Sequence, residues 1–228
     1  MKILTKVLVG SRLHGLDTPE SDYDYRGIHI HELKEVLSPF RTLKNTTWIE
    51  GDEDNTSYEL RDFCKQATKG NATILEVFFS NKVISTTPVA EELRKNWIKF
   101  MDTDQFVAAS RGYAANQYNK MQLFDPDKRT PKFAVAYLRV LWQCSEYLRT
   151  GTFPCQIQGE TGEFAKKVKY TSLDTFGELV PELTERFMIL QAEVSKAYAS
   201  ATITKPDIKW IEEFIYEAYN DAGATRKR

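Results

Sequence analysis

The sequence predicts an α+β protein in which a small mixed β-sheet near the N-terminus is followed by a C-terminal helical region. Before Pro88, short segments rich in β-branched and aromatic residues alternate with turn signals, as is typical of strands. After Pro88, apolar residues recur at the spacing of helices. The 228 residues suffice for one large domain or two small ones. We therefore expect a core over residues 1–88 and a helical region over residues 89–228 that packs against it.

Each strand expected in the N-terminal part is bounded by glycine, proline or acidic turn residues. The first is an apolar run that ends at Gly10-Ser11, and one helical turn is expected directly after it, up to residue 16. The second strand follows a turn signal at residues 18–21, and a polar turn over residues 51–55 separates the last two. The expected strands are Lys6–Val9, Tyr23–His31, Thr46–Ile49 and Thr56–Leu60.

The helices are expected from the period of the apolar residues and from the residues at their ends. Lys132–Arg149 is the strongest case, because Pro131 lies at its first turn and Gly151 lies just beyond its end. Loops are expected over residues 122–130 and 150–162. The expected helices are Arg61–Thr68, Ala72–Phe79, Pro88–Met101, Asp104–Met121, Lys132–Arg149, Glu182–Ser200 and Pro206–Asp221.

The composition excludes several classes of protein. Hydrophobic residues make up 42% of the chain and charged residues 28%, which is ordinary for a globular protein and argues against disorder. No apolar run approaches the ~18 residues of a membrane span, and the N-terminus lacks the features of a signal peptide. The three cysteines are never at Cys-x-x-Cys spacing, which disfavours a disulfide framework and a zinc knuckle. We expect a cytoplasmic protein without a membrane partner.

Two aspartates at a spacing of two carry the strongest chemical signal. In an extended segment the side chains of Asp22 and Asp24 face the same way, about 6.6 Å apart along the strand. Two like charges repel one another, and a divalent cation removes that cost. Mg²⁺ is bound by one or two carboxylates together with phosphate oxygens and water. The pair therefore predicts a Mg²⁺ or Mn²⁺ site that binds a nucleoside triphosphate, with an acidic surface turn as the alternative.

The Gly10-Ser11 pair supplies the complementary phosphate contacts. A glycine lets the backbone approach a ligand closely, and N–H groups at the start of a following helix favour phosphate oxygens. A third carboxylate on a neighbouring strand would complete a second metal site or take the proton from the attacking hydroxyl.

Glu59 is the best candidate for this third carboxylate, because Tyr58 and Leu60 flank it on an expected strand. Residues 52–54 lie in a polar loop next to a glycine, which we expect to be too poorly held for catalytic geometry. Glu50 lies at the entrance of that loop. Asp62 falls in the first turn of a helix, where the helix dipole alone explains a carboxylate.

Several basic side chains are expected to contact the phosphates. A guanidinium group matches phosphate oxygens, Lys65 lies on the helix after Glu59, and His14 lies within the phosphate loop. Lys132 and Arg139 share a helical face within residues 94–149, a segment with ten Lys/Arg and five Asp/Glu residues. Solvated surface is the alternative for these side chains. The residues expected to bind the nucleotide are Gly10, Ser11, Arg12, His14, Arg26, Lys65, Lys132 and Arg139.

The segment from Gly10-Ser11 through Asp22-Tyr23-Asp24 to Gly27 resembles the signature of DNA polymerase β-type nucleotidyltransferases. It is similar to the predicted nucleotidyltransferases of the RNA-repair-pathway polymerase-β-like family, which is common in bacteria and bacteriophages. The similarity continues through residues 58–63 and 69–79. It implies a nucleotidyltransferase core with Asp22, Asp24 and Glu59 as the catalytic metal ligands. A phage-encoded member would act in the host cytoplasm.

The expected reaction is the metal-dependent transfer of a nucleoside monophosphate from a nucleoside triphosphate to a hydroxyl group, with release of pyrophosphate. The acceptor could be an RNA end, a protein side chain or a small molecule, and the residues decide neither the acceptor nor the oligomeric state. The first alternative is a non-catalytic regulatory module that binds a nucleotide with the same fold. The second is a metal-dependent phosphohydrolase that uses the same carboxylates.

Overall fold

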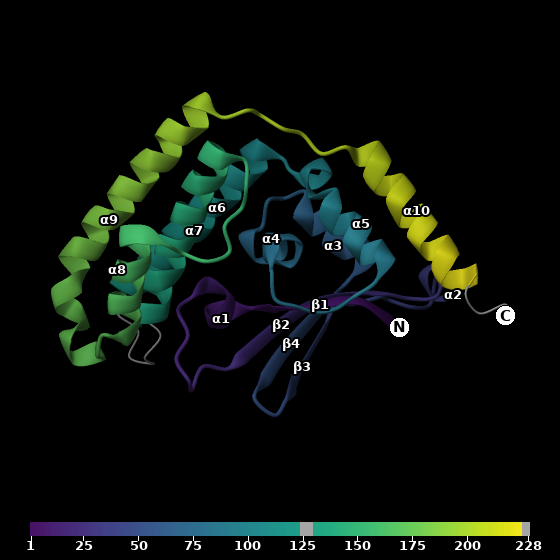
Figure 1. Ribbon diagram of the computed structural model, residues 1–228, viewed down its shortest axis with the longest axis horizontal. Coiled ribbons are helices and arrows are strands. Elements are labelled where there is room, and N and C mark those ends of the chain that lie inside the picture. Colours follow the sequence, from purple (N-terminus) through teal and green to yellow (C-terminus); the bar gives the residue numbers. More distant parts are fainter. Residues whose placement is uncertain (124–129, 225–228) are drawn as a thin grey trace. The chain divides into compact units, whose positions relative to one another are not determined.

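The structure, a computed structural model, describes residues 1–123 and 130–224 (Figure 1). The loop expected over residues 122–130 lies almost entirely outside these residues. The described chain forms two compact units. The first contains residues 1–13 and 17–102 together with the last helix, and the second contains residues 14–16 and the helices between residues 103 and 203.

A five-stranded mixed sheet with the strand order β3-β4-β2-β1-β5 forms the centre of the first unit. Antiparallel pairing joins β1 to β2 and to β5, and β3 to β4, whereas β2 and β4 run parallel. All four expected strands are present, and the structure adds a fifth at the edge of the sheet. The strands are β1 (Lys2–Val9), β2 (Tyr23–Ile30), β3 (Thr46–Glu50), β4 (Glu53–Glu59) and β5 (Val83–Thr86).

Because the hairpin between β3 and β4 is tight, β4 begins at Glu53, earlier in the sequence than the expected Thr56. Glu50 pairs with Glu53, so the connection consists of Gly51 and Asp52 alone. Gly51 has a φ of 59°, the left-handed conformation that such short hairpin loops require. Residues 53–55, expected in the turn, are therefore part of the strand, and the parallel register places Asp54 opposite Asp24.

The helices α3, α4 and α5 of the first unit lie on one face of the sheet (Figure 1). Arg26 on β2 points to this face, because its Nη1 atom donates to the Thr73 carbonyl at 3.1 Å and to Glu76 Oε2 at 2.5 Å on α4. The helices of this unit are α1 (Gly10–His14), α2 (Leu33–Val36), α3 (Leu60–Ala67), α4 (Ala72–Phe79), α5 (Pro88–Lys95), the 3₁₀ helix η1 (Trp97–Phe100) and α10 (Ile208–Ala224).

A chain of aromatic contacts explains why residues 89–102 and α10 belong to the unit that contains the sheet. The Phe78 ring lies 5.3 Å from those of Phe63 and Phe100, and the Phe100 ring meets Trp210 of α10 edge-on at 6.0 Å. Phe63 and Phe100 are fully buried. Such ring pairs stabilise the fold by more than the burial of their apolar area alone. This core therefore joins α10 to helices that are distant in sequence.

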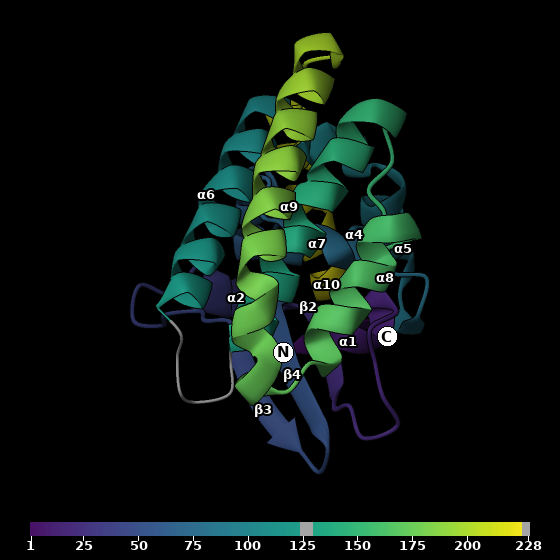
Figure 2. The ribbon, with the colours of Figure 1, turned by 90° about the vertical axis from the view of Figure 1, so that its left-hand side faces the viewer.

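The second unit consists of the helices α6 (Thr103–Gln122), α7 (Thr130–Thr150), α8 (Gly159–Tyr170) and α9 (Leu173–Ser200), shown in Figure 2. The buried Tyr137 hydroxyl of α7 donates to the Leu183 carbonyl of α9 at 2.7 Å. Three of these helices confirm predicted segments, whereas no helix was predicted at α8, whose first residues fall within the loop expected over residues 150–162. In addition, α9 begins before the expected Glu182 and continues through Pro181. None of the helices in the described ranges is long and apolar enough to cross a membrane.

Glu59 ends β4 and caps the following helix α3. Its Oε2 atom accepts from the backbone N–H groups of Arg61 at 3.1 Å and Asp62 at 3.3 Å. The Tyr219 hydroxyl of α10 donates to the other oxygen, Oε1. The Glu59 side chain is buried, and burial together with this hydrogen bond raises the pKa of Tyr219. The carboxylate thus holds together a strand end, a helix start and the C-terminal helix.

We predict that Tyr219→Phe lowers the free energy of unfolding by about 1.5–3 kcal/mol, because a buried hydrogen bond to a charged group is lost. Tyr216→Phe on the exposed side of the same helix is the matched control and should change stability little. Urea denaturation of both variants measures the difference. Equal stability of the two variants would show that the Tyr219–Glu59 contact does not stabilise the fold.

Candidate functional site

The carboxylate of Asp24 lies against the backbone of Gly10. The antiparallel pairing of β1 and β2 sets Val9 opposite Asp24, so the strand end and the aspartate are adjacent. Gly10 has a φ of 67°. A Cβ atom at this position would lie 1.8 Å from Asp24 Oδ2, which no side chain could accommodate without displacing the carboxylate. Glycine is thus required here both for the backbone conformation and for the space that the carboxylate fills.

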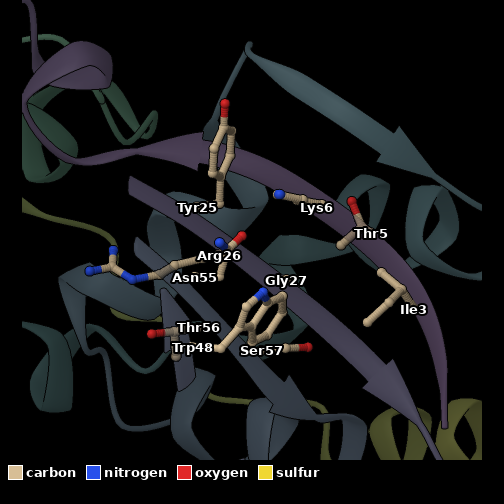
Figure 3. A pocket seen from close by; sticks show the side chains of 10 residues that line it. All are labelled: Ile3, Thr5, Lys6, Tyr25, Arg26, Gly27, Trp48, Asn55, Thr56 and Ser57. Atoms are coloured by element: carbon tan, nitrogen blue, oxygen red, sulfur yellow. The ribbon is translucent and has the colours of Figure 1, made fainter. Parts of the chain in front are cut away.

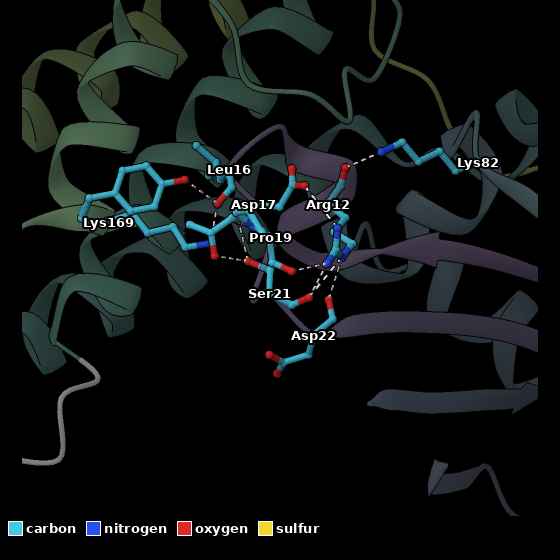
Figure 4. Close-up of polar contacts among 10 residues, drawn as sticks. Arg12, Leu16, Asp17, Pro19, Ser21, Asp22, Lys82 and Lys169 are labelled. Carbon is cyan, nitrogen blue, oxygen red and sulfur yellow. Dashed lines mark hydrogen bonds and ion pairs between the residues drawn. The ribbon is translucent and has the colours of Figure 1, made fainter. Parts of the chain in front are cut away.

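Arg12 holds the loop that carries Asp22 (Figure 4). Its Nε atom donates to the carbonyls of Ser21 at 3.1 Å and Asp22 at 3.3 Å, and its Nη2 atom donates to Ser21 at 2.6 Å. Its guanidinium also lies 4.0 Å from the centre of the Tyr23 ring. The donors expected to contact phosphate are therefore largely used within the loop. Arg12 positions Asp22 in this structure.

Asp22 and Asp54 line one pocket at the end of the sheet where β2 begins, and Arg12 and Asp52 contribute to its wall. Asp24 lies beside them, because β2 and β4 pair in parallel with Asp24 opposite Asp54. Paired residues in neighbouring strands point to the same face of a sheet. Three carboxylates from two strands and one loop thus converge on this end of the sheet.

The surroundings of Asp24 disfavour its charged form. Burial raises the pKa of Asp24 most, the guanidinium of Arg26 opposes this effect, and the negative charges of Asp22, Asp54 and Glu76 raise the pKa further. A carboxylate that is desolvated among like charges is stabilised when a cation binds beside it. The electrostatic balance at Asp24 is therefore suited to a bound cation.

The structure does not bring Glu59 together with Asp22 and Asp24, which corrects the sequence-based expectation. In the parallel register Glu59 pairs with His29 at the far end of β2, about 16 Å along the strand from the Asp24–Asp54 pair. Its carboxylate is occupied by the α3 backbone, Arg61 and Tyr219. Asp54 is the carboxylate of β4 that lies opposite Asp24. The Gly51-Asp52 pair, which is typical of two-residue hairpin loops, was the sequence signal that could have placed Asp54 on the strand.

Two expected phosphate contacts of the first unit lie elsewhere. Arg26 is engaged in an ion pair with Glu76, whose side chain is buried, and so joins β2 to α4. Lys65 lies on α3 and lines a pocket with Arg61 and Glu59, at the end of β4 remote from Asp54. Gly10 and Ser11 are the first two residues of α1, at the helical turn expected after the first strand.

The other expected contacts belong to the second unit. The side chain of His14 is buried, and its carbonyl accepts from the Ile157 N–H group at 3.2 Å. Arg139 is also buried, and its Nη1 atom donates to Gln143 Oε1 at 3.0 Å. Gln143 in turn donates to the Pro154 carbonyl at 2.9 Å, so Arg139 supports an internal loop. Lys132 is exposed on α7.

Within the described residues, no group of three or more His, Cys, Asp or Glu side chains is arranged closely enough to hold a metal ion by itself. Mg²⁺ in phosphate sites does not need such a group, since it takes one or two carboxylates and completes its shell with substrate oxygens and water. Asp22 and Asp24, with Asp54 beside them, provide carboxylates of this kind. The arrangement can therefore bind a cation together with a phosphate group.

Comparison with known proteins gives three findings. A profile of the family described as "RNA repair pathway DNA polymerase beta family" matches residues 1–179. The uncharacterized protein MJ0002 of Methanocaldococcus jannaschii is 32% identical over 92 residues, which cover 39% of this chain and 37% of that relative. The chain thus matches little more than a third of the length of this relative. A crystal structure of a nucleotidyltransferase-like protein from Exiguobacterium sibiricum aligns with 100% of this chain and 76% of its own, at 13% identity and a TM-score of 0.31.

We predict that Asp24→Asn raises the melting temperature at pH 7 without added metal. The pKa of Asp24 is raised in the folded state, so ionisation of Asp24 costs stability as the pH rises from 3.8, its ordinary value, through its folded pKa. The gain from the substitution should be full above the folded pKa and should shrink as the pH falls towards 3.8. Thermal unfolding at steps from about pH 7 to about pH 4 measures this gain in melting temperature.

The control is Glu217→Gln, which removes an exposed carboxylate from α10. A gain for Asp24→Asn that stayed constant down to the lowest pH, or that matched the control, would contradict the electrostatic description of Asp24.

Proposed function

Since the chain belongs to the RNA repair pathway DNA polymerase beta family, we propose that it is a metal-dependent nucleotidyltransferase. It transfers a nucleoside monophosphate from a nucleoside triphosphate to a hydroxyl acceptor and releases pyrophosphate. The observation that supports this most is the placement of Asp24 against Gly10, with Asp54 opposite it on β4 and Asp22 at the start of the strand. The family's description favours an RNA end as the acceptor.

Mg²⁺, or Mn²⁺, fits the residues of this site. The Asp24 carboxylate fills the space that a Cβ atom on residue 10 would take. The like charges around Asp24 disfavour its ionised form, and a bound cation would stabilise that form. Asp22 and Asp24 would hold the metal, with Asp54 as the third carboxylate. When bound, the metal neutralises the charge of the phosphate oxygens.

The protein's own residues would position the substrate. The backbone at Gly10 and Ser11, where β1 turns into α1, would contact the triphosphate with its N–H groups and with the Ser11 hydroxyl. Arg12 keeps Asp22 in place through its bonds to the loop carbonyls. Asp54 would accept the proton of the attacking hydroxyl or share in binding the metal. Positioning and charge neutralisation supply most of the rate in phosphoryl transfer.

A non-catalytic module that binds nucleotides with the same fold is the second candidate, since the geometry of Asp24 against Gly10 suits binding as well as transfer. Incubation with each α-labelled nucleoside triphosphate, Mg²⁺ or Mn²⁺ and an RNA oligonucleotide separates the candidates. Label on an acceptor supports transfer, and unchanged but bound triphosphate supports the module. Free monophosphate would instead indicate a phosphohydrolase.

We predict that the double substitution of Asp22 and Asp24 by Asn abolishes transfer and metal-dependent triphosphate binding, because both carboxylates of the proposed metal site are lost. The label transfer assay and equilibrium binding with and without Mg²⁺ measure this. Thermal unfolding shows that the variant is folded. Transfer at the rate of the unaltered protein would refute the proposed metal site.

The third carboxylate gives a separate prediction. Asp54→Asn should lower the transfer rate at least about 100-fold while triphosphate binding persists, as loss of a base or second metal ligand does. Glu59→Gln should instead lower the melting temperature and leave the rate per folded molecule within about threefold, because Glu59 caps α3 and binds Tyr219. Rates are compared at a temperature at which both variants are folded. The opposite result would restore Glu59 to the site and remove Asp54.

A further inference from the structure

A pocket on the opposite face of the sheet has walls of apolar and aromatic side chains. It is centred on Gly27 of β2, and Tyr25, Trp48, Ile3 and Lys6 surround this glycine (Figure 3). Trp48 is 37% exposed and Ile3 is 39% exposed, so part of the wall faces solvent. The helices α3, α4 and α5 lie on the other face of the sheet.

The hollow is built into the backbone of the sheet. A Cβ atom on Gly27 would lie 2.7 Å from the Thr5 carbonyl of the neighbouring strand, so a side chain cannot be added there without moving β1. Trp48 pairs with Asn55, and Tyr25 pairs with the same asparagine from the other side. The two aromatic side chains therefore stand on either side of β4 and face the same way.

A buried hydrogen-bond acceptor without a partner lies in the wall of this pocket. Asn55 is 1% exposed and lines the pocket, and its Oδ1 atom receives no hydrogen bond from any described residue. Its Nδ2 atom makes a long bond to the Glu53 carbonyl, at 3.4 Å, and the Asn55 amide also hydrogen-bonds the Glu53 carboxylate. A buried acceptor that receives no hydrogen bond is costly, so a ligand N–H group that reached Oδ1 would remove this cost.

The charge at the pocket is balanced. The Lys6 ammonium lies 2.9 Å from Glu53 Oε2 and 4.1 Å from the centre of the Tyr25 ring. The pocket thus offers ring faces and one unpaired acceptor but no unpaired cation to a phosphate group. Tyr23, 41% exposed, stacks with Tyr25 at 6.3 Å and an interplanar angle of 11°, but it lines the pocket of Asp22 and Asp54 and not this one.

We propose that this pocket binds a nucleobase, either of a single-stranded nucleic acid or of a free nucleotide. A base is flat, stacks on aromatic side chains, and carries the N–H donor that Asn55 Oδ1 lacks. The site differs from the carboxylate site, because Tyr25 and Asp24 are consecutive on β2 and so point to opposite faces. Its occupation does not depend on the proposed transfer reaction. With Lys6 already paired, binding should change little with salt.

The experiment measures fluorescence anisotropy of a short fluorescein-labelled oligoadenylate with the full chain in EDTA. Trp48→Ala should weaken binding about tenfold or more, as loss of a stacking platform does. Phe40→Ala is the matched control, because it removes an aromatic side chain that is 95% exposed elsewhere in the same unit. The double substitution of Asp22 and Asp24 by Asn should leave this binding unchanged, which separates the proposal from the proposed function. Asn55→Ala provides a second variant, and melting temperatures confirm that each protein is folded.

Competition by adenosine monophosphate would assign the pocket to a single nucleotide, and binding of the strand alone would assign it to a continuous single strand. Either outcome supports the proposal when Trp48→Ala or Asn55→Ala weakens it. The proposal is overturned if an abasic strand of the same length binds equally well, since the base is then irrelevant. It is also overturned if both variants bind like the unaltered protein, or if neither the strand nor the monophosphate binds.

Discussion

The parallel pairing of β2 with β4 decides which carboxylates of this protein can act together. Because its register sets Asp24 against Asp54 and His29 against Glu59, the two ends of β2 receive different acidic partners. At one end Asp24 lies against Gly10 with the charges of Asp22 and Asp54 near it, and at the other a single glutamate caps a helix. A shift of this register by one residue would turn every side chain of β4 to the other face of the sheet. The site and the core both depend on this one pairing.

The aspartates are held by groups that do no chemistry themselves. Gly10 has no side chain and so leaves room for the Asp24 carboxylate. The Arg12 guanidinium donates to carbonyls of the loop that leads to Asp22. The Arg26–Glu76 pair joins β2 to α4. Within this pair Arg26 opposes the rise of the Asp24 pKa, whereas Glu76 adds to it. Both arginines thus make contacts within the protein that hold β2 and the loop before it.

The sequence alone predicted the strands that end at conspicuous turn residues and the helices with clear apolar periods. It also placed Asp22 and Asp24 in one site with Gly10-Ser11, and the structure brings Asp24 against Gly10, while the role of these residues stays a prediction. The acidic partner of Asp24 on β4 could not be predicted, because it depends on strand register, which is a long-range property, and on a hairpin loop of Gly51 and Asp52 that is shorter than expected. The side chains of Arg12, Arg26 and Glu59 could not be assigned for a similar reason. Their partners lie on other elements or in loop backbone, and a sequence pattern does not show which acceptor a guanidinium or hydroxyl reaches.

The alternation of side chains along β2 separates two kinds of chemistry on one strand. Asp24 and Arg26 point towards the helices, where burial and neighbouring charges control ionisation. Tyr25 and Gly27 point the other way, where aromatic side chains surround the glycine and Lys6 is paired with Glu53. Asp54 and Asn55 repeat this division on β4, since they pair with Asp24 and Tyr25. The pairing of β2 with β4 therefore determines which side chains lie on each face of the sheet. A side chain on one face can be replaced without altering the strand register on which the other face depends.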